Sequence, residues 1–402
     1  MRVLFSFVGG TGHFNPLIPI ARAAEAAGHV VAVTGRPAMM PAVRAAGFTA
    51  TAFATGEADT GTTPVRTELQ APDAEHEAQV VRRAFAGRLA RARAPLIIDL
   101  CGVWRPDLLV CDEMDFGAIV AAERAGMPHA TVIVIAAGSF VPAELVAEPV
   151  QALRSEHGLP PDPDLNMLSR YLVLSPVPPS YRDPRFPLPP TAHSLQPFGL
   201  NLDGGDLAPP WLAQIAETPT VYFTLGTVFN LESGDLLNRV VAALGEMPIN
   251  LVVSVSNEID PAELGPQPTN VRVERYIPQA VLFPHCDLVV SHGGSGTVIG
   301  ALAHGLPMVL IPLGADQLVN AERCLALGVA RVLDAMTITP ETVREAVLSV
   351  LADAPFRQQA QRIKDEVAAL PGPEYAVALL ERLASEQRPI LSSRAVAPAT
   401  RG

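Results

Sequence analysis

The amino-acid sequence predicts an α/β protein of two domains, each built around a parallel sheet. Its 402 residues exceed the length of one typical domain, and hydrophobic residues make up 49%, enough to bury two cores. Short apolar runs alternate with segments of helical spacing in both halves, which is the pattern of βαβ units. The predicted parts are an N-terminal domain over 1–205, a linker over 206–218, a C-terminal domain over 219–386 and a flexible tail over 387–402.

The first half begins with an apolar strand over 3–8, and a glycine-rich turn follows it. Asn15 is a candidate N-cap for the next helix, with Pro16 at its first position and Gly28 after its end. Proline pairs then interrupt the alternation over 136–218, which predicts a loop-rich binding surface followed by the linker. The other elements expected before this interruption are strands at 29–33, 47–53, 108–111 and 130–135, helical structure over 75–100 and a helix ending at 126.

The second half resumes the alternation at Thr220. Thr339 is a candidate N-cap with Pro340 at the first helical position, and the last helices are expected over about 340–386. The expected strands of this half lie at 220–224, 250–255, 271–274, 287–291, 308–311 and 330–333.

Composition excludes several functional classes. The net charge of −12 and the pI of about 5.2 argue against nucleic acid as the main partner, because phosphate backbones need a basic face. No apolar run reaches the length of a membrane span, and the first strand leads into a turn and not into a cleavage site. We therefore expect a cytoplasmic protein without stable membrane insertion. The cysteines, Cys101, Cys111, Cys286 and Cys324, lack metal-ligand spacing.

The strongest local signal is the glycine-rich sequence HGGSGT at 292–297. It lies between an apolar strand and a helix, an order that brings backbone N–H groups and a helix N-terminus to an anion, most often a phosphate. The Ser295 and Thr297 hydroxyls add to the backbone donors of Gly294 and Gly296. A structural turn would need fewer small residues, so we interpret this segment as a phosphate cradle.

A polar pair follows the next predicted strand. Asp316 and Gln317 are suited to binding hydroxyl groups, although on their own they would be interpreted as caps of the following helix. A phosphate cradle followed by hydroxyl-binding groups predicts a sugar nucleotide as ligand.

A candidate general base lies in the sequence VGGTGHFNP at 8–16. His13 is expected at the mouth of a cleft between the domains, and imidazole is the usual general base near neutral pH. The alternative is a loop histidine that only packs. A dinucleotide fingerprint is excluded, because its third glycine would fall at 15, where Asn15 stands.

Asp112 is the candidate partner of this histidine. It directly follows the strand at 108–111, and residues just past the ends of parallel strands face the same crevice. A carboxylate on the Nδ1 atom of His13 would hold the tautomer and stabilise the imidazolium. Glu113 and Asp115 are alternatives, and Asp115 is also a possible helix N-cap.

The segment Asp162-Pro163-Asp164 has the pattern of metal-dependent sugar transferases. It lies among prolines and not after a strand, so we interpret it as a loop and expect no metal site.

Together these residues resemble the inverting sugar-nucleotide glycosyltransferases with two facing Rossmann-like domains and a deep interdomain cleft, the GT-B fold. The resemblance extends over about 1–386 and is greatest to bacterial enzymes that glycosylate macrolides, enediynes and glycopeptides. It rests on VGGTGHFNP, on YIPQ at 276–279, on HGGSGT, and on PLGADQ with the following Asn320 and Ala321.

The resemblance implies that His13 deprotonates an acceptor hydroxyl with support from Asp112, and that the sugar is transferred with inversion. Tyr276 stands where the family usually has a base-stacking Trp. The implied acceptor is a small lipophilic natural product, whose pocket Met114, Phe116, Phe140 and Met167 could line, although core packing explains them equally well. The implied donor-binding residues are Gly12 in the first loop, Thr227, His292, Gly294, Ser295, Gly296 and Thr297 at the diphosphate, Tyr276, Ile277 and Gln279 at the base, and Asp316 and Gln317 at the sugar.

One departure from the family pattern indicates the nucleotide. Enzymes that use UDP-sugars often carry a Glu eight residues after the phosphate-binding His, where it binds the ribose hydroxyls; here that position is Gly300. We therefore expect a TDP-sugar, and within that class a deoxysugar, as co-substrate, with no metal or other cofactor.

Other functions of the same fold stay open. A sugar-nucleotide epimerase would need a cluster of carboxylates and basic residues, which the sequence does not show. A non-catalytic accessory protein would tolerate the loss of His13. A lipid-linked cell-wall glycosyltransferase would need a basic membrane patch, although a solvated helix face also explains the candidate residues. The sequence does not decide between a monomer and a homodimer. The arginines of that candidate patch are Arg82, Arg83, Arg88, Arg91 and Arg93.

Overall fold

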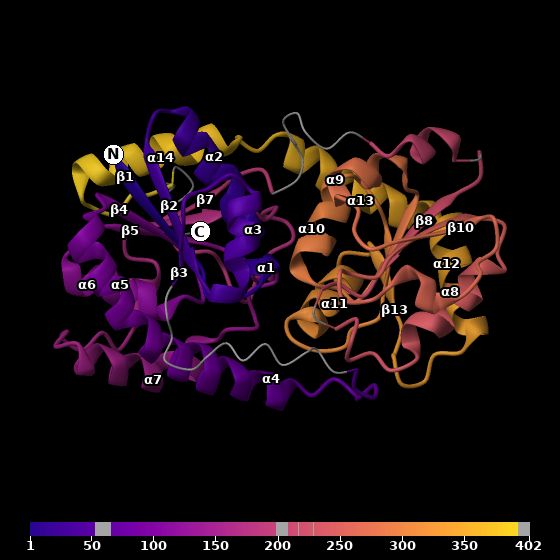
Figure 1. Cartoon of the computed structure of the whole chain (residues 1–402), viewed down its shortest axis with the longest axis horizontal. Helices are drawn as coiled ribbons and strands as arrows, with labels where there is room; N and C mark the ends of the chain where they lie inside the picture. The colour runs from indigo at the N-terminus through magenta and orange to yellow at the C-terminus, as the bar shows by residue number, and fades with distance from the viewer. Residues whose placement is uncertain (53–65, 198–207, 216, 228, 393–402) are drawn as a thin grey trace, which may run out of the picture. The chain divides into compact units, whose positions relative to one another are not determined.

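The computed structural model describes two compact units (Figure 1). Among the described residues no helix is long and apolar enough to cross a bilayer. Unit 1 comprises Met1–Thr60, Glu75–Phe198 and Leu370–Gly402, and unit 2 comprises Gly61–Ala74 and Gly199–Ala369. The residues that the structure describes are 1–52, 66–197, 208–215, 217–227 and 229–392.

Unit 1 is built on a seven-stranded parallel sheet with the order β3-β2-β1-β4-β5-β6-β7. The order reverses between β1 and β4, and ligands of open parallel sheets bind at such switch points. The strands are β1 (Arg2–Ser6), β2 (Val30–Gly35), β3 (Ala50–Ala52), β4 (Leu108–Asp112), β5 (His129–Val132), β6 (Leu172–Ser175) and β7 (Ala192–Ser194).

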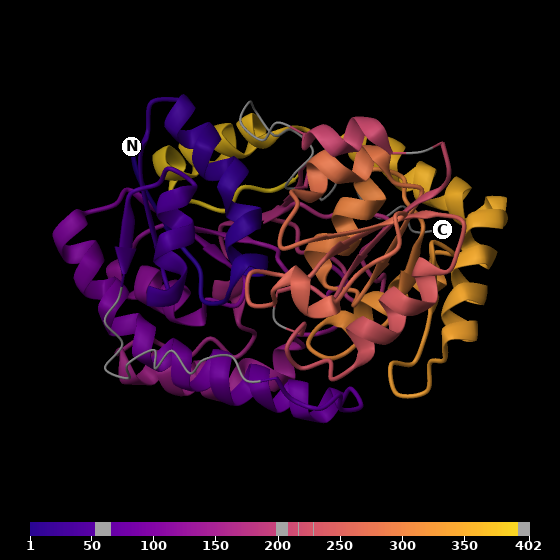
Figure 2. The ribbon, with the colours of Figure 1, turned by 45° about the vertical axis from the view of Figure 1, so that its right-hand side comes forward.

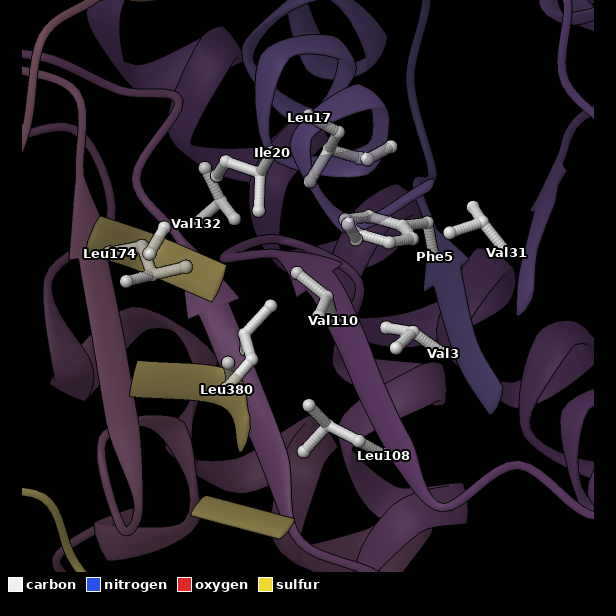
Figure 3. Close-up of a cluster of buried hydrophobic side chains, with 14 of the residues drawn as sticks. Val3, Phe5, Leu17, Ile20, Val31, Leu108, Val110, Val132, Leu174 and Leu380 are labelled. Carbon is white, nitrogen blue, oxygen red and sulfur yellow. The ribbon is translucent and has the colours of Figure 1, made fainter. Parts of the chain in front are cut away.

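Helices cover both faces of this sheet, because alternate residues of each strand point to opposite sides. Val3 and Phe5 of β1 face a core that includes Leu17, Ile20 and Leu380 from helices (Figure 3). Leu4 of the same strand faces a second core. The helices of unit 1 are α1 (Thr11–Phe14), α2 (Ile18–Ala26), α3 (Met40–Ala45), α4 (Ala74–Val80), α5 (Ala90–Trp104), α6 (Phe116–Ala125), α7 (Ala143–Glu156) and α14 (Pro373–Glu386).

The prediction that the alternation of strands and helices is interrupted over 136–218 is only partly correct. The segment contains α7 and contributes β6 and β7 to the sheet, paired in parallel register. Both strands are short, and two of the proline pairs that suggested a loop, Pro178-Pro179 and Pro189-Pro190, lie between them. The structure therefore has two more strands in unit 1 than the sequence pattern predicted.

The C-terminal segment belongs to unit 1, which differs from the predicted domain over 219–386 and tail over 387–402. Helix α14 packs against α2, and Leu380 is buried in the first core (Figures 1 and 3). Ile390 is also buried there, and its backbone N–H donates to the Tyr171 carbonyl at 2.8 Å. The chain thus packs against unit 1 through residue 392, and the rest of the predicted tail lies outside the described residues.

Unit 2 is built on a six-stranded parallel sheet with the order β10-β9-β8-β11-β12-β13. Helices α8 and α12 lie side by side on one face of this sheet (Figure 2). Thr339 caps α12, as predicted, and also forms a capping box with Thr342. The strands are β8 (Thr220–Thr224), β9 (Asn250–Ser254), β10 (Val271–Glu274), β11 (Leu288–Ser291), β12 (Met308–Leu310) and β13 (Ala330–Val332). The helices are α8 (Leu236–Gly245), α9 (Gln279–Leu282), α10 (Ser295–Ala303), α11 (Gln317–Ala326), α12 (Pro340–Ala352) and α13 (Ala354–Ala368).

The predicted helical segment over 75–100 contains an unexpected feature. Between α4 and α5 the chain forms a π-helix, η3 (Val81–Leu89), and helical structure continues without a break from Ala74 to Trp104. Wide turns of this kind occur mostly as single-turn bulges and often at functional sites.

Candidate functional site

His13 lies in the short helix α1, which begins directly after the turn that follows β1. Its N-cap is Gly10, and no side chain caps it. The sequence prediction that Asn15 caps the helix was therefore wrong: Asn15 instead begins a 3₁₀ turn (Asn15–Leu17) that joins α1 to α2. The helix starts early because a glycine N-cap lets the chain turn without a side-chain acceptor.

Asp112 lies next to His13, as its place at the end of a parallel strand led us to expect. Nδ1 of His13 is 3.2 Å from Oδ1 of Asp112, whose side chain is 0% exposed. The carboxylate accepts the backbone N–H of Val8 at Oδ2 and that of Met114 at Oδ1, each at 2.8 Å. Because two backbone donors hold the carboxylate, its direction toward the imidazole is set by the main chain.

The backbone of Gly9 passes against the imidazole ring at its Cδ2 atom. A Cβ atom on Gly9 would lie 2.0 Å from Cδ2 of His13 and 2.5 Å from its Nε2. Both distances are too short for any residue that has a side chain. Only glycine therefore allows the turn to carry the ring in this orientation.

The two acidic alternatives to Asp112 have structural roles. Asp115 caps α6 by accepting from the Ala118 N–H and forms a buried ion pair with Arg93, whose Nε and Nη2 lie at 3.0 and 2.7 Å. Glu113 accepts the backbone N–H groups of Val134 and Ile135 at 2.8 and 2.7 Å. Burial raises the pKa of Glu113, and the two backbone donors oppose that shift.

The glycine-rich segment of unit 2 forms the predicted strand–turn–helix. Strand β11 ends at Ser291, and Gly294 is the N-cap of α10 with no side-chain cap of its own. The first backbone N–H groups of α10 therefore have no capping side chain, which leaves a helix N-terminus suited to an anion.

His292 packs between two glycines beside this helix terminus. A Cβ atom on Gly226, which has φ +79°, or on Gly294 would lie 2.6 Å from Nε2 of His292. Burial lowers the pKa of His292 to about 4, and a hydrogen bond with the backbone of Thr224 opposes that shift only in part. The imidazole is therefore neutral at physiological pH.

A hydrogen-bond network joins the glycine-rich segment to Asp316. Oδ2 of Asp316 accepts the Ser295 hydroxyl at 2.5 Å and the Asn320 amide at 2.8 Å. The same amide donates to the Gly293 carbonyl at 3.0 Å. In the sequence, Asn320 stands out only as part of the motif that follows Asp316. Its position one helical turn after Asp316 could have indicated the hydrogen bond between the two side chains.

Gln317 braces the loop that precedes it. Its side chain is 2% exposed, and Oε1 accepts the backbone N–H groups of Leu313 and Gly314 at 2.7 and 3.2 Å. The adjacent Ala315 has φ 50°, an unfavourable backbone region for a residue with a side chain. The Gln317 carbonyl is thus used to hold the loop that presents Asp316.

The residues predicted at the base differ in exposure. Tyr276 is 67% exposed, whereas Ile277 is buried. Nε2 of Gln279 donates to Oγ1 of Thr297 at 3.0 Å, which ties α9 to α10. Thr227 lies exposed in the loop after β8.

The predicted acceptor residues lie mostly in the core. Met114, Phe116 and Met167 are buried in the second core of unit 1, which favours the interpretation as core packing for these three. Phe140 is only partly buried against that core, so it remains a candidate for acceptor contact.

Asp162 belongs to a loop, as predicted, where its carboxylate accepts the backbone N–H groups of Asn166 and Met167. Within the described part of the chain no cluster of three or more metal-ligating side chains is present. Three arginines of the candidate basic patch pair with acids: Arg82 with Glu148, Arg91 with Glu156 and Arg93 with Asp115.

Curated proteins whose sequences are similar to that of this chain are transferases of natural-product biosynthesis. The L-demethylnoviosyl transferase of Streptomyces niveus is 30% identical over 397 residues, covering 96% of this chain and 99% of the relative. The 3-alpha-mycarosylerythronolide B desosaminyl transferase of Saccharopolyspora erythraea is 27% identical, covering 96% and 99%.

Solved structures with a similar fold include the glycosyltransferase SnogD from Streptomyces nogalater, with a TM-score of 0.76 at 25% identity over 96% of this chain and 99% of that one. The spinosyn rhamnosyltransferase SpnG complexed with thymidine diphosphate has a TM-score of 0.78 at 25% identity, covering 95% and 100%. Glycosyltransferase VinC in complex with DTDP has a TM-score of 0.75 at 26% identity, covering 96% and 100%.

Two family models together match most of the chain. They describe the N-terminal domain of the erythromycin biosynthesis protein CIII-like family, over residues 22–226, and its C-terminal domain, over residues 238–383. The chain therefore belongs to the erythromycin biosynthesis protein CIII-like family and is a glycosyltransferase of the GT-B fold.

Proposed function

We propose that this glycosyltransferase moves a deoxysugar from a TDP-sugar to a hydroxyl of a small lipophilic natural product, with inversion at the anomeric carbon. The observation that carries the proposal is the contact of 3.2 Å between His13 and Asp112, at the carboxyl end of the parallel sheet. The relatives support the donor class, since SpnG and VinC are described with thymidine diphosphate bound.

His13 acts as the general base in this proposal. Its Nδ1 faces Asp112, so the lone pair for the acceptor proton is on Nε2. The acceptor oxygen forms a bond to the anomeric carbon while the bond from that carbon to the diphosphate breaks, and the hydroxyl proton moves to Nε2. Asp112 stabilises the resulting imidazolium and holds its tautomer. Attack from the face opposite the leaving group inverts the anomeric configuration.

The leaving diphosphate is held by unit 2. The N-terminus of α10 supplies backbone N–H groups and the positive end of the helix dipole, which can stabilise the departing charge without a metal. His292, neutral and fixed between two glycines, donates one N–H to a phosphate oxygen. Gly12 and Thr227 are proposed as further donor contacts. The hydroxyls of Ser295 and Thr297 adjoin the same helix terminus.

The sugar and the base are recognised on either side of this helix. Asp316, fixed by Ser295 and Asn320, accepts hydroxyl protons from the sugar. Gln317 contributes its amide Nε2, because its carbonyl braces the loop. Tyr276, Ile277 and Gln279 are proposed around thymine, and Gly300 in place of a carboxylate favours a deoxyribose.

The other functions considered lack comparable support. A lipid-linked cell-wall transferase would need free basic groups at a membrane, whereas Arg82 and Arg91 are paired with acids. A sugar-nucleotide epimerase of the same fold would need a cluster of carboxylates and basic residues, which the sequence does not show.

The test uses the full chain with TDP-sugars and a panel of lipophilic alcohols. We expect TDP release coupled to glycoside formation, with the anomeric configuration of the product opposite to that of the donor by NMR. Matched UDP- and GDP-sugars serve as controls. Retention of configuration, or a preference for another nucleotide, would contradict the proposal.

A further inference from the structure

We propose that Phe85 is a positioning residue for His13, which holds the imidazole in the orientation that proton transfer needs. The inference rests on the proposed function, because it assumes that His13 is the base. It adds a residue that lies far from His13 in the sequence and carries no chemistry of its own.

The geometry that points to Phe85 is a ring contact. The Phe85 and His13 rings are parallel to within 13°, with their centroids 5.8 Å apart. This offset-stacked arrangement lies in the range that aromatic pairs prefer. With Asp112 at Nδ1 and Gly9 against the ring at Cδ2, the stacked Phe85 ring limits one face of the imidazole. The three contacts together restrict rotation of the His13 side chain.

The backbone that presents Phe85 is unusual. Phe85 lies at the middle of the π-helix η3, and its carbonyl accepts the N–H of Ala90, five residues later. The wider turn changes the direction in which side chains leave the helix compared with a continuous α-helix. A regular helix over the same residues would therefore present a different face to His13.

A side-chain contact also fixes the position of this helical segment relative to β1, the strand that leads to His13. Arg93, in the helix that continues η3, donates from Nη2 to the Ser6 hydroxyl at 2.9 Å, and Ser6 is the last residue of β1. The same guanidinium pairs with Asp115 at 2.7 Å in a site that is 3% exposed on the arginine. The buried pair thus holds the helix that carries Phe85 against the end of β1.

The stacked ring has two effects on the proposed reaction. It keeps the imidazole close to Asp112, and its π-face attracts the imidazolium that forms as the proton is taken up. Both effects are greatest in the transition state, so their loss should lower kcat more than it raises KM for the acceptor.

The experiment compares Phe85→Leu and Phe85→Tyr, each in the wild-type and His13→Ala backgrounds. TDP-rhamnose, a TDP-deoxysugar, is the donor, and para-nitrobenzyl alcohol and para-nitrophenol are acceptors of similar shape but different acidity. Leu89→Ala is the matched control, since Leu89 is half-buried in the same π-helix and packs against the same core. Thermal unfolding of every variant reports its folding.

We expect Phe85→Leu to lower kcat for the alcohol by roughly 3- to 10-fold, with the acceptor KM nearly unchanged. The loss should be small for the phenol, absent in Phe85→Tyr and absent in the His13→Ala background. Leu89→Ala should not reproduce this pattern. If Phe85→Leu fails to fold, Phe85→Met, whose flexible side chain fills the same space, is measured in its place.

Three results would overturn the proposal. Phe85→Leu could leave both acceptors unaffected, it could raise the acceptor KM equally for both, which is the pattern of a direct acceptor contact, or its loss could persist without His13. A wild-type enzyme that shows no transfer, or a His13→Ala variant with full activity, would instead contradict the proposed function. The two failures are therefore distinguishable.

Discussion

The buried pair of Arg93 and Asp115 allows a stability prediction to be worked from the structure. Asp115 is 0% exposed and accepts four donors: the Ser6 hydroxyl at 2.7 Å, two guanidinium nitrogens of Arg93 and the Ala118 N–H at 3.2 Å. The perturbation is Asp115→Ala, which removes the carboxylate while Arg93 stays buried. It also removes the N-cap of α6.

Removing one partner of a buried ion pair typically costs about 3–5 kcal/mol, because the other charge loses its compensation without returning to water. The lost N-cap accounts for about 1 kcal/mol of this effect. At about 2–4 °C per kcal/mol for a domain of this size, the melting temperature of unit 1 should fall by roughly 6–20 °C.

The assay is differential scanning calorimetry of the full chain, with the transitions of the two units analysed separately. Asp99→Ala is the control, since Asp99 lies exposed on α5, the helix that carries Arg93. Its effect should stay within about 0.5 kcal/mol. Replacing both partners with apolar residues, as in Arg93→Met with Asp115→Leu, should recover much of the loss. A decrease below about 1 kcal/mol for Asp115→Ala, or an equal decrease for Asp99→Ala, would refute this reasoning.

Three further predictions concern unit 2. The pKa of His292 is depressed from 6.5 to about 4 in the folded chain, so the unfolded state binds more protons between these pH values. The contribution of His292 to the free energy of unfolding should therefore be fully present above pH 6.5 and fall by up to about 3 kcal/mol toward pH 4. Denaturant midpoints measured against pH test this, and His292→Gln should flatten the curve. We expect the wild type to bind TDP more tightly than UDP by calorimetry, and Gly300→Glu should reduce this difference in affinity. The substitution requires the Phe283 ring, 3.0 Å from the new Cβ, to move slightly. Tighter binding of UDP by the wild type would contradict the prediction. Turnover should survive EDTA, because the helix N-terminus supplies the positive potential; loss on chelation that Mg²⁺ restores would overturn it.

Most of the parallel framework could be predicted from the sequence, because buried strands appear as short apolar runs and parallel strands align their carboxyl ends. The same rule placed Asp112 beside His13, and the structure shows them 3.2 Å apart. The glycine-rich turn before α10 could be predicted equally well, because its small residues follow a strand directly.

The remaining features depend on contacts that no local pattern records. Strands β6 and β7 are short and separated by prolines, so their pairing becomes visible only in the assembled sheet. The return of α14 to unit 1 depends on the apolar surface that α2 presents to it. The contact of Phe85 with His13 is made from a π-helix, which the helical spacing of 75–100 does not distinguish from an α-helix.

The measurement that tests the central claim most directly is the turnover of His13→Ala with an alkyl alcohol acceptor, alongside its affinity for TDP. A positioned base typically contributes roughly 10²- to 10⁴-fold, and an alcohol is a poor nucleophile until its proton is removed. We predict a loss of kcat by about that factor with TDP affinity nearly unchanged, because His13 belongs to unit 1, whereas the helix α10 that we propose binds the diphosphate belongs to unit 2. Near-native turnover of His13→Ala with this acceptor would contradict the account.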